Sequence, residues 1–152
     1  MVYSPVQAET TDTVENVLAL LEHHQIRSAP IVNHDNVLVG MFGISSILYS
    51  LLPVSARMED GLRKLNFVTG TMPDVSDRLD AIKNDNVEKH IDADTHVVHA
   101  DTSLVEAIRI LTKYGGPVPV VEKGTGKLEG LVTEQSLLSS IRSSNQEADS
   151  NT

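Results

Sequence analysis

Apolar positions along the chain recur twice with the spacing of an amphipathic helix. In the two stretches, these positions are Val14, Val17, Leu18 and Leu21, and then Leu104, Ala107, Ile108 and Leu111. Both sets follow the i, i+3, i+4, i+7 spacing of a helix with one buried face. A short polar residue with glutamate three positions later opens each stretch, Asp12 with Glu15 and Ser103 with Glu106, and this predicts capped helix starts. The two patterns superimpose with a shift of 90 residues.

The repetition continues beyond these helices. Each copy next has a short apolar strand with a proline near its start, where the missing N–H is tolerated, then a polar turn and a second apolar strand. Such a pattern predicts a β-hairpin. A strand precedes each first helix, more clearly in the second copy, and a helix ends each copy. Besides the two helices, the predicted elements lie at residues 5–8, 29–32, 37–42 and 46–52, and at residues 96–99, 118–121, 128–132 and 136–141.

The order of these elements, with a proline-containing apolar strand followed by a Gly–apolar–apolar strand, resembles the CBS domain. Two copies in one chain resemble a CBS pair, also called a Bateman module. The resemblance implies an α+β fold in which two β-α-β-β-α repeats pack as a pseudo-two-fold pair. We expect repeat 1 at residues 1–52, a helical insert at 53–85, repeat 2 at 86–142 and a disordered tail at 143–152.

The segment between the repeats has its own apolar spacing. Met58, Leu62 and Leu65 predict one helix, residues 71–74 a turn, and Val75, Leu79 and Ile82 a second helix; Val87 and Ile91 form a last turn. Such spacing needs a packing partner, so we expect an ordered insert instead of a flexible linker. The tail has almost nothing to bury, which is the basis for expecting disorder there.

Composition narrows the function. The 152 residues include no cysteine, which excludes disulfides and a cysteine nucleophile, and the net charge of −9 argues against nucleic-acid binding. No apolar run approaches the ~20 residues of a membrane span, and the N-terminus lacks the pattern of a secretory signal, so we expect a cytoplasmic protein. No nucleophile elbow, Walker loop or Gly-x-Gly-x-x-Gly motif is present, and we expect no enzyme activity.

The resemblance also implies a ligand, an adenosine-containing nucleotide in the cleft between the repeats. The family motif there is Gly–apolar–apolar–Thr/Ser–x–x–Asp, whose carboxylate binds the ribose. Repeat 2 keeps Gly130 and Thr133 but has Ser136 at the aspartate position, and repeat 1 has Gly43 and Ser46 at the threonine and aspartate positions. The better candidate site comprises Thr133, Ser136, Gly130, Leu131, Val132, Val118, Pro119 and Val120. The weaker candidate site comprises Gly40, Gly43, Ser45, Ser46, Ala29, Pro30 and Ile31.

These residues also have a purely structural interpretation. Thr133 with Ser136, and Ser45 with Ser46, are residue types that cap helix N-termini without any ligand. The histidines near residue 95 resemble a metal cluster when read along the chain, but His96 and His99 would face opposite sides of a strand. We therefore expect no metal site.

The leading hypothesis is a regulatory module that binds AMP, ADP, ATP or S-adenosylmethionine, with no obligatory cofactor, and passes a shape change to an unidentified effector protein. Mg²⁺ enters only as a companion of ATP. The alternatives are a ligand-free structural or oligomerisation module, and a regulatory fragment of a larger enzyme or transporter. We expect a homodimer through the terminal helix of each repeat, with an apolar face formed by Ile47, Leu48, Leu51, Leu137, Leu138 and Ile141.

Overall fold

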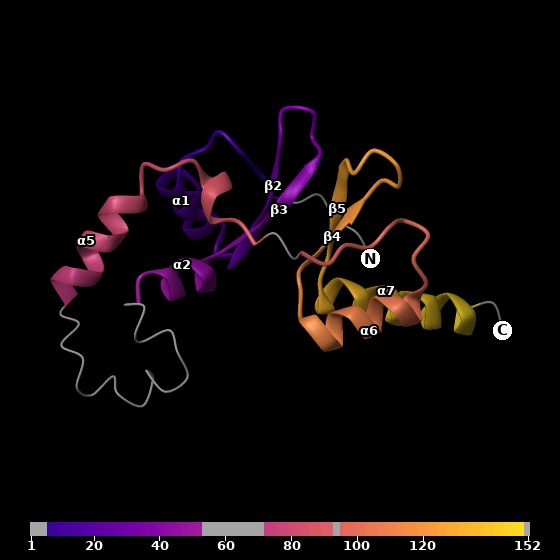
Figure 1. Cartoon of the computed structure of the whole chain (residues 1–152). Coiled ribbons are helices and arrows are strands. Elements are labelled where there is room, and N and C mark those ends of the chain that lie inside the picture. The colour runs from indigo at the N-terminus through magenta and orange to yellow at the C-terminus, as the bar shows by residue number, and fades with distance from the viewer. Residues whose placement is uncertain (1–5, 53–71, 93–94, 151–152) are drawn as a thin grey trace.

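Two copies of a helix–hairpin–helix unit form the fold, the first preceded by a short strand, with further helices between the copies (Figure 1). The computed structural model describes residues 6–52, 72–92 and 95–150. Repeat 1 contains β1 (Ala8–Glu9), α1 (Val14–His24), β2 (Ser28–Val32), β3 (Leu38–Gly43) and α2 (Ile44–Ser50). The insert contributes α5 (Met72–Ile82) and the 3-10 helix η1 (Val87–His90). Repeat 2 contains α6 (Leu104–Tyr114), β4 (Val118–Val121), β5 (Leu128–Val132) and α7 (Glu134–Ser150).

The strands confirm the two predicted hairpins. β2 pairs antiparallel with β3, and β4 pairs antiparallel with β5. The leading strands differ from the expectation. In repeat 1, the leading strand β1 lies at Ala8–Glu9 and pairs parallel with β2. In repeat 2, the leading strand predicted more clearly at residues 96–99 forms only a single β-bridge, between Val98 and Val120.

The first helix of repeat 1 is capped by a different residue from the one we expected. Thr13 is the N-cap of α1, and its hydroxyl accepts a hydrogen bond from the N–H of Asn16 at 3.2 Å. Asp12 lies one residue earlier, and its carboxylate accepts from the N–H of Glu9 at 2.9 Å. The capping prediction was therefore wrong by one residue, because Asp12 closes the preceding turn instead of the helix.

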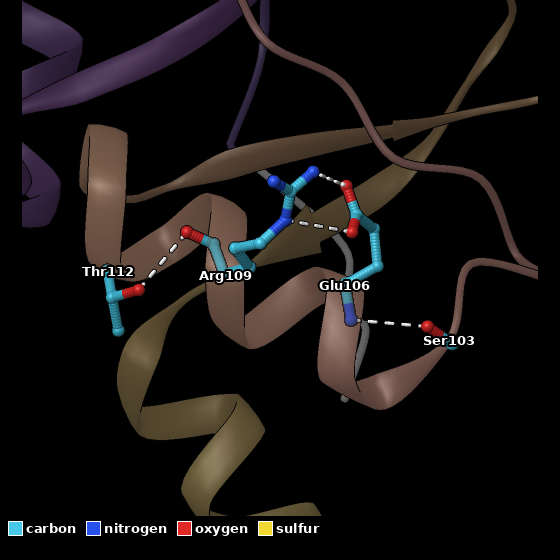
Figure 2. A network of polar contacts seen from close by, with 4 residues as sticks. All are labelled: Ser103, Glu106, Arg109 and Thr112. Carbon is cyan, nitrogen blue, oxygen red and sulfur yellow. Dashed lines mark hydrogen bonds and ion pairs between the residues drawn. The ribbon is translucent and has the colours of Figure 1, made fainter.

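Helix α6 begins at the predicted cap, but its glutamate has another partner (Figure 2). The hydroxyl of Ser103 accepts from the N–H of Glu106 at 3.1 Å. The Glu106 carboxylate accepts two hydrogen bonds from the Arg109 guanidinium, at 2.8 and 3.1 Å. The hydrogen bond from Arg109 lowers the pKa of Glu106. Only the serine half of the predicted capping box is therefore formed.

Each repeat has its own apolar core. Core 1 consists of Ala8, Val14, Val17, Leu21, Ala29, Ile31, Phe42, Ile47 and Val87. Core 2 consists of Val98, Ala107, Leu111, Val118, Val120, Val132 and Leu137. Among the residues predicted for a dimer face, Ile47, Leu51 and Leu137 are buried within their own chain. Leu48 and Leu138, 90 residues apart, remain 59% and 55% exposed.

The end of the insert completes repeat 1. The side chain of Val87, at the start of the segment that we expect to be repeat 2, is fully buried in core 1. The N–H of Val14 donates to the carbonyl of Asp85 at 3.0 Å, and the N–H of Val87 donates to the carbonyl of Asp12 at 2.8 Å. Residues 85–87 thus pack as part of repeat 1, because α1 offers both an apolar face and free N–H groups at its start.

Two further expectations about helices need correction. Residues 71–74 were predicted to be a turn, but α5 begins at Met72, with Pro73 in the first helical turn, where proline is tolerated. The tail was predicted to be disordered from residue 143, but α7 continues to Ser150, since this segment contains no glycine or proline to end a helix. The apolar pattern at residues 58–65 lies outside the described residues. No helix in the described part of the chain is long and apolar enough to cross a membrane.

The tips of the two hairpins are joined through their backbones. The N–H of Leu38 donates to the carbonyl of Gly126 at 3.0 Å, and the N–H of Leu128 donates to the carbonyl of Asn36 at 2.9 Å. The Asn36 side chain also donates to the carbonyl of Leu128 at 3.2 Å. β2 and β4 both begin at the opposite end of their hairpins from this junction, so the space between the repeats opens near Ser28 and Val118.

The position of Val87 generates a stability prediction. Val87→Ala removes buried methyl groups from core 1 and leaves a cavity, so we expect a loss of about 2 kcal/mol in the free energy of unfolding. Val105→Ala is the matched control, because Val105 is 76% exposed and should change this free energy by less than about 0.5 kcal/mol. Chemical denaturation measures both. Equal effects of the two substitutions would contradict the assignment of Val87 to core 1.

Candidate functional site

Three cavities adjoin one another where the hairpins begin, and all three are lined by Gly116 and Pro117. We call them the larger cleft, of about 510 Å³, the smaller cleft, of about 180 Å³, and the α7 cavity, of about 610 Å³. The larger cleft and the α7 cavity also share Thr133 and Gln135. Because of these shared lining residues, we treat the larger cleft and the α7 cavity as one hollow, which is large enough for a small-molecule ligand.

The larger cleft takes its walls from both repeats. Its lining residues are Val6, Gln25, Ile26, Arg27, Ser28, Gly116, Pro117, Leu131, Thr133 and Gln135. Arg27 is the one charged side chain among them, and it lies next to β2 at the start of the hairpin. Hence the larger cleft carries a positive charge in a chain whose net charge is −9.

The start of α7 forms the polar wall of this hollow. The hydroxyl of Thr133 accepts from the N–H of Ser136 at 3.0 Å, and the hydroxyl of Ser136 accepts from the N–H of Thr133 at 2.9 Å. Ser136 also donates to the carbonyl of Thr133 at 3.0 Å, so its hydroxyl is engaged within the cap. The Thr133 hydroxyl keeps its hydrogen for a ligand, as do the N–H groups of Glu134 and Gln135, which have no acceptor within a helix at its first turn.

The smaller cleft is the counterpart of the larger one in the other repeat. It is lined by Ser28, Met41, Asp92, Thr95, His96, Tyr114, Gly115, Gly116, Pro117 and Val118. Val6 and Leu131 in the larger cleft correspond to His96 and Met41 in the smaller one, in both cases 90 residues apart. The clefts are thus related by the pseudo-two-fold arrangement of the repeats and share Ser28, Gly116 and Pro117 as a common wall.

Few of the sequence-predicted site residues line these cavities. Thr133, Ser136 and Leu131 line the larger cleft or the α7 cavity, and Val118 lines the smaller cleft. The other predicted residues of repeat 2 are buried in its hairpin, namely Pro119, Val120, Gly130 and Val132. In repeat 1, the predicted residues buried in the hairpin are Ala29, Pro30, Ile31 and Gly40. Those at the start of α2, which line none of the cavities described above, are Gly43, Ser45 and Ser46.

The sequence analysis missed the residues at, or just before, the start of each first hairpin strand. Arg27 and Ser28 precede Ala29 in the same way that Gly116 and Pro117 precede Val118. All four line the larger cleft. Two features of the sequence could have indicated them. The four residues occupy equivalent positions in front of the two proline-containing segments, and Arg27 is the only Lys or Arg in residues 1–54.

The histidines of the predicted linear cluster have separate partners. His90 Nε2 lies 3.0 Å from the carboxylate of Asp85, and His99 Nδ1 lies 2.9 Å from the carbonyl of Val121. His96 stacks on Tyr114 with ring centroids 3.6 Å apart. Within the described residues, no three His, Asp or Glu side chains are grouped so as to hold a metal ion.

The CBS domain family model matches residues 1–53 and 87–143. The chain therefore belongs to the CBS domain family, and the two matched segments make it a CBS pair. No curated protein matches the chain.

Solved structures share the same fold. A CBS domain-containing protein of unknown function from Bacillus anthracis str. Ames Ancestor superimposes with a TM-score of 0.71 and 15% identity, over 93% of this chain and 89% of that chain. The structure of CBSX2 in complex with AMP superimposes with a TM-score of 0.65 and 19% identity, over 93% of each chain. The structure of CbpB in complex with c-di-AMP superimposes with a TM-score of 0.65 and 14% identity, over 97% of this chain and 83% of that chain.

The wall of the smaller cleft generates a prediction at Gly40. A Cβ atom at this position would lie 2.8 Å from the backbone carbonyl oxygen of Asp92, so Gly40→Ser forces the two segments apart. We expect a loss of about 1–3 kcal/mol in the free energy of unfolding. Gly43→Ser is the control, because its Cβ has no neighbour closer than 3.9 Å and serine is favoured at the N-cap of α2. Denaturation midpoints that fall equally for both variants would refute the close approach of Gly40 to the carbonyl oxygen of Asp92.

Proposed function

We propose that this chain is a non-catalytic regulatory module that binds an adenine nucleotide in the larger cleft and the adjoining α7 cavity. The observation that carries the proposal is the lining of that cleft. Apolar side chains from both repeats line the larger cleft, where Arg27 is the only charged residue of the lining, and Glu134 lines the adjoining α7 cavity. An anionic ligand with an apolar base fits such a lining, since few polar groups on apolar walls are typical of small-molecule sites.

The lining supports one orientation of the nucleotide. Val6, Ile26 and Leu131 offer apolar contacts to the base, while Arg27 and Thr133 offer a cation and a hydroxyl to the phosphate. The first N–H groups of α7 add the positive end of the helix dipole. Because the net charge of the whole chain repels anions, these local groups would have to provide the attraction.

Two structural relatives support the choice of an adenine nucleotide. One relative is described in complex with AMP and the other in complex with c-di-AMP. Their identity to this chain is below 20%, so the similarity itself concerns the fold. The proposal for this chain therefore depends on the lining of its own cleft.

Ser136 is expected to weaken the contact to the ribose. The family motif has aspartate at this position, and the Ser136 hydroxyl is engaged with both the N–H and the carbonyl of Thr133. A hydrogen bond to a charged group contributes about 1.5–3 kcal/mol, against about 0.5–1.5 kcal/mol for a neutral one. We therefore expect roughly ten- to a hundred-fold weaker binding than with a carboxylate at this position.

The mechanism we propose is a population shift. The larger cleft is lined by Val6 and Arg27 from repeat 1 and by Leu131 and Thr133 from repeat 2. A ligand that contacts both walls stabilises the arrangement of the repeats in which these walls are close. An effector protein that distinguishes the two arrangements would then sense the nucleotide.

The test is a thermal-shift and calorimetric titration with AMP, ADP, ATP and S-adenosylmethionine, with and without Mg²⁺. At a hundred times the Kd, we expect the best ligand to raise the Tm by roughly 5–10 °C. Glu134 is the one acidic residue in the lining of the larger cleft and the α7 cavity, and no group of three metal-binding side chains occurs among the described residues, so we expect binding of AMP not to depend on Mg²⁺.

Arg27→Ala is expected to weaken that binding by about 10- to 100-fold, since it removes the one cation of the cleft. Arg109→Ala is the matched control, because Arg109 pairs with Glu106 on α6 and does not line the larger cleft. Millimolar concentrations of all four ligands without any shift would refute the nucleotide-sensor proposal. That outcome favours the alternative, a ligand-free oligomerisation module.

We also propose a homodimer, and the exposed residues at equivalent places in α2 and α7 support it. Leu48 and Leu138 are 59% and 55% exposed, although both are large apolar side chains. Ile141 is half-buried on the same helix as Leu138. This is a smaller apolar face than the six residues we had expected.

Leu138→Asp is expected to shift the chain towards monomer in sedimentation velocity, because it introduces a charge into the proposed contact. Val105→Asp is the control, since Val105 is also an exposed apolar residue, at 76%, but lies on α6. A wild-type chain that sediments as a monomer at every concentration would contradict the dimer.

A further inference from the structure

The charged residues around the three adjoining cavities are unevenly distributed. Arg27 lines the larger cleft, Glu134 lines the α7 cavity and Asp92 lines the smaller cleft. Among the described lining residues, neither the α7 cavity nor the smaller cleft has a lysine or an arginine. A guanidinium is thus present only in the larger cleft, and each of the two neighbouring cavities contains a carboxylate.

The carboxylate of Glu134 lies beside the wall that the cavities share. Glu134 is the first residue of α7, and its side chain is exposed. Its Oε1 atom lies 3.8 Å from the point that a Cβ atom on Gly116 would occupy. Because Gly116 lines all three cavities, this carboxylate lies where the larger cleft adjoins the α7 cavity.

No ion pair within the described residues neutralises Arg27 or Glu134. The ion pairs found there join other side chains. A carboxylate in the first turn of a helix is stabilised by the helix dipole, and Glu134 therefore also has a structural role. The equivalent residue of repeat 1 is the uncharged Ile44, the first residue of α2. The positive end of α7 thus already has an anion beside it, whereas that of α2 does not.

The number of phosphate groups decides how a nucleotide would meet these charges. In the orientation proposed above, Arg27 and Thr133 offer a cation and a hydroxyl to one phosphate. Further phosphates extend beyond Arg27, and the adjoining cavities offer them a carboxylate and no lysine or arginine among the described lining residues. Like charges a few ångströms apart repel each other, and more strongly where protein walls displace water.

We propose that the larger cleft selects nucleotides with a single phosphate group, and that Glu134 is the residue that determines this selectivity. AMP carries its charge on the one phosphate that Arg27 attracts. ADP and ATP carry additional charge towards the carboxylate of Glu134. The inference rests on the proposed function and adds to it the class of nucleotide and the residue that disfavours the other classes.

The test is a calorimetric titration of the full chain with AMP and with ATP, in EDTA so that Mg²⁺ does not neutralise the triphosphate. The readout is the Kd of ATP divided by the Kd of AMP. Glu134→Gln removes the carboxylate with little change in size. Glu129→Gln is the matched control, because Glu129 is an exposed glutamate on β5 that lines none of the cavities described above, and the substitution changes the net charge equally. Thermal melts of both variants show whether they fold.

We expect AMP to bind the wild type about tenfold more tightly than ATP, since solvent screens part of the repulsion from an exposed carboxylate. Glu134→Gln should lower the ratio of the two Kd values by about fivefold, chiefly by strengthening the binding of ATP, whereas Glu129→Gln should leave the ratio within about twofold. Raising NaCl from about 0.05 to 0.5 M should also lower the wild-type ratio, because salt screens the repulsion.

ATP that binds the wild type as tightly as AMP would overturn the inference and leave the proposed function standing. An unchanged ratio in folded Glu134→Gln would do the same. If Glu134→Gln does not fold, the salt titration of the wild type decides, and a ratio that does not fall with salt overturns the inference. No binding of either nucleotide to the folded wild type would overturn both the inference and the proposed function.

Discussion

The packing of residues 85–92, and of Thr95, against repeat 1 is the constraint on which the rest of the structure depends. Asp85 and Val87 pair with the start of α1, Val87 fills core 1, and Asp92 with Thr95 pairs with the edge of β3. The same few residues thus pack into core 1 and line the smaller cleft. A connection that only spanned the gap between the repeats would do none of these things.

This constraint makes the pseudo-two-fold pair asymmetric where a ligand would bind. The two clefts share Ser28, Gly116 and Pro117 as a wall but differ in volume and in charge. Asp92 and Thr95 line the smaller cleft, whereas the larger cleft has the greater volume and Arg27 as its charged residue. The net charge of −9 makes that single cation matter more, because the surrounding field does not attract anions.

Much of the fold could be predicted from the sequence, because a 90-residue repeat of apolar spacing determines helices and hairpins locally. The N-cap at Thr13 was missed by one residue, since Asp12 and Thr13 are both good caps and the preceding turn decides between them. The burial of Val87 in repeat 1 and the role of Arg27 in the larger cleft depend on tertiary packing. Periodicity along the chain carries no information about such packing.

The most direct measurement is a crystal structure of the full chain grown with AMP. The account predicts density for a nucleotide in the larger cleft, between Arg27 and Leu131. Density in the smaller cleft, with Asp92 and Thr95 displaced from Met41, would contradict the account.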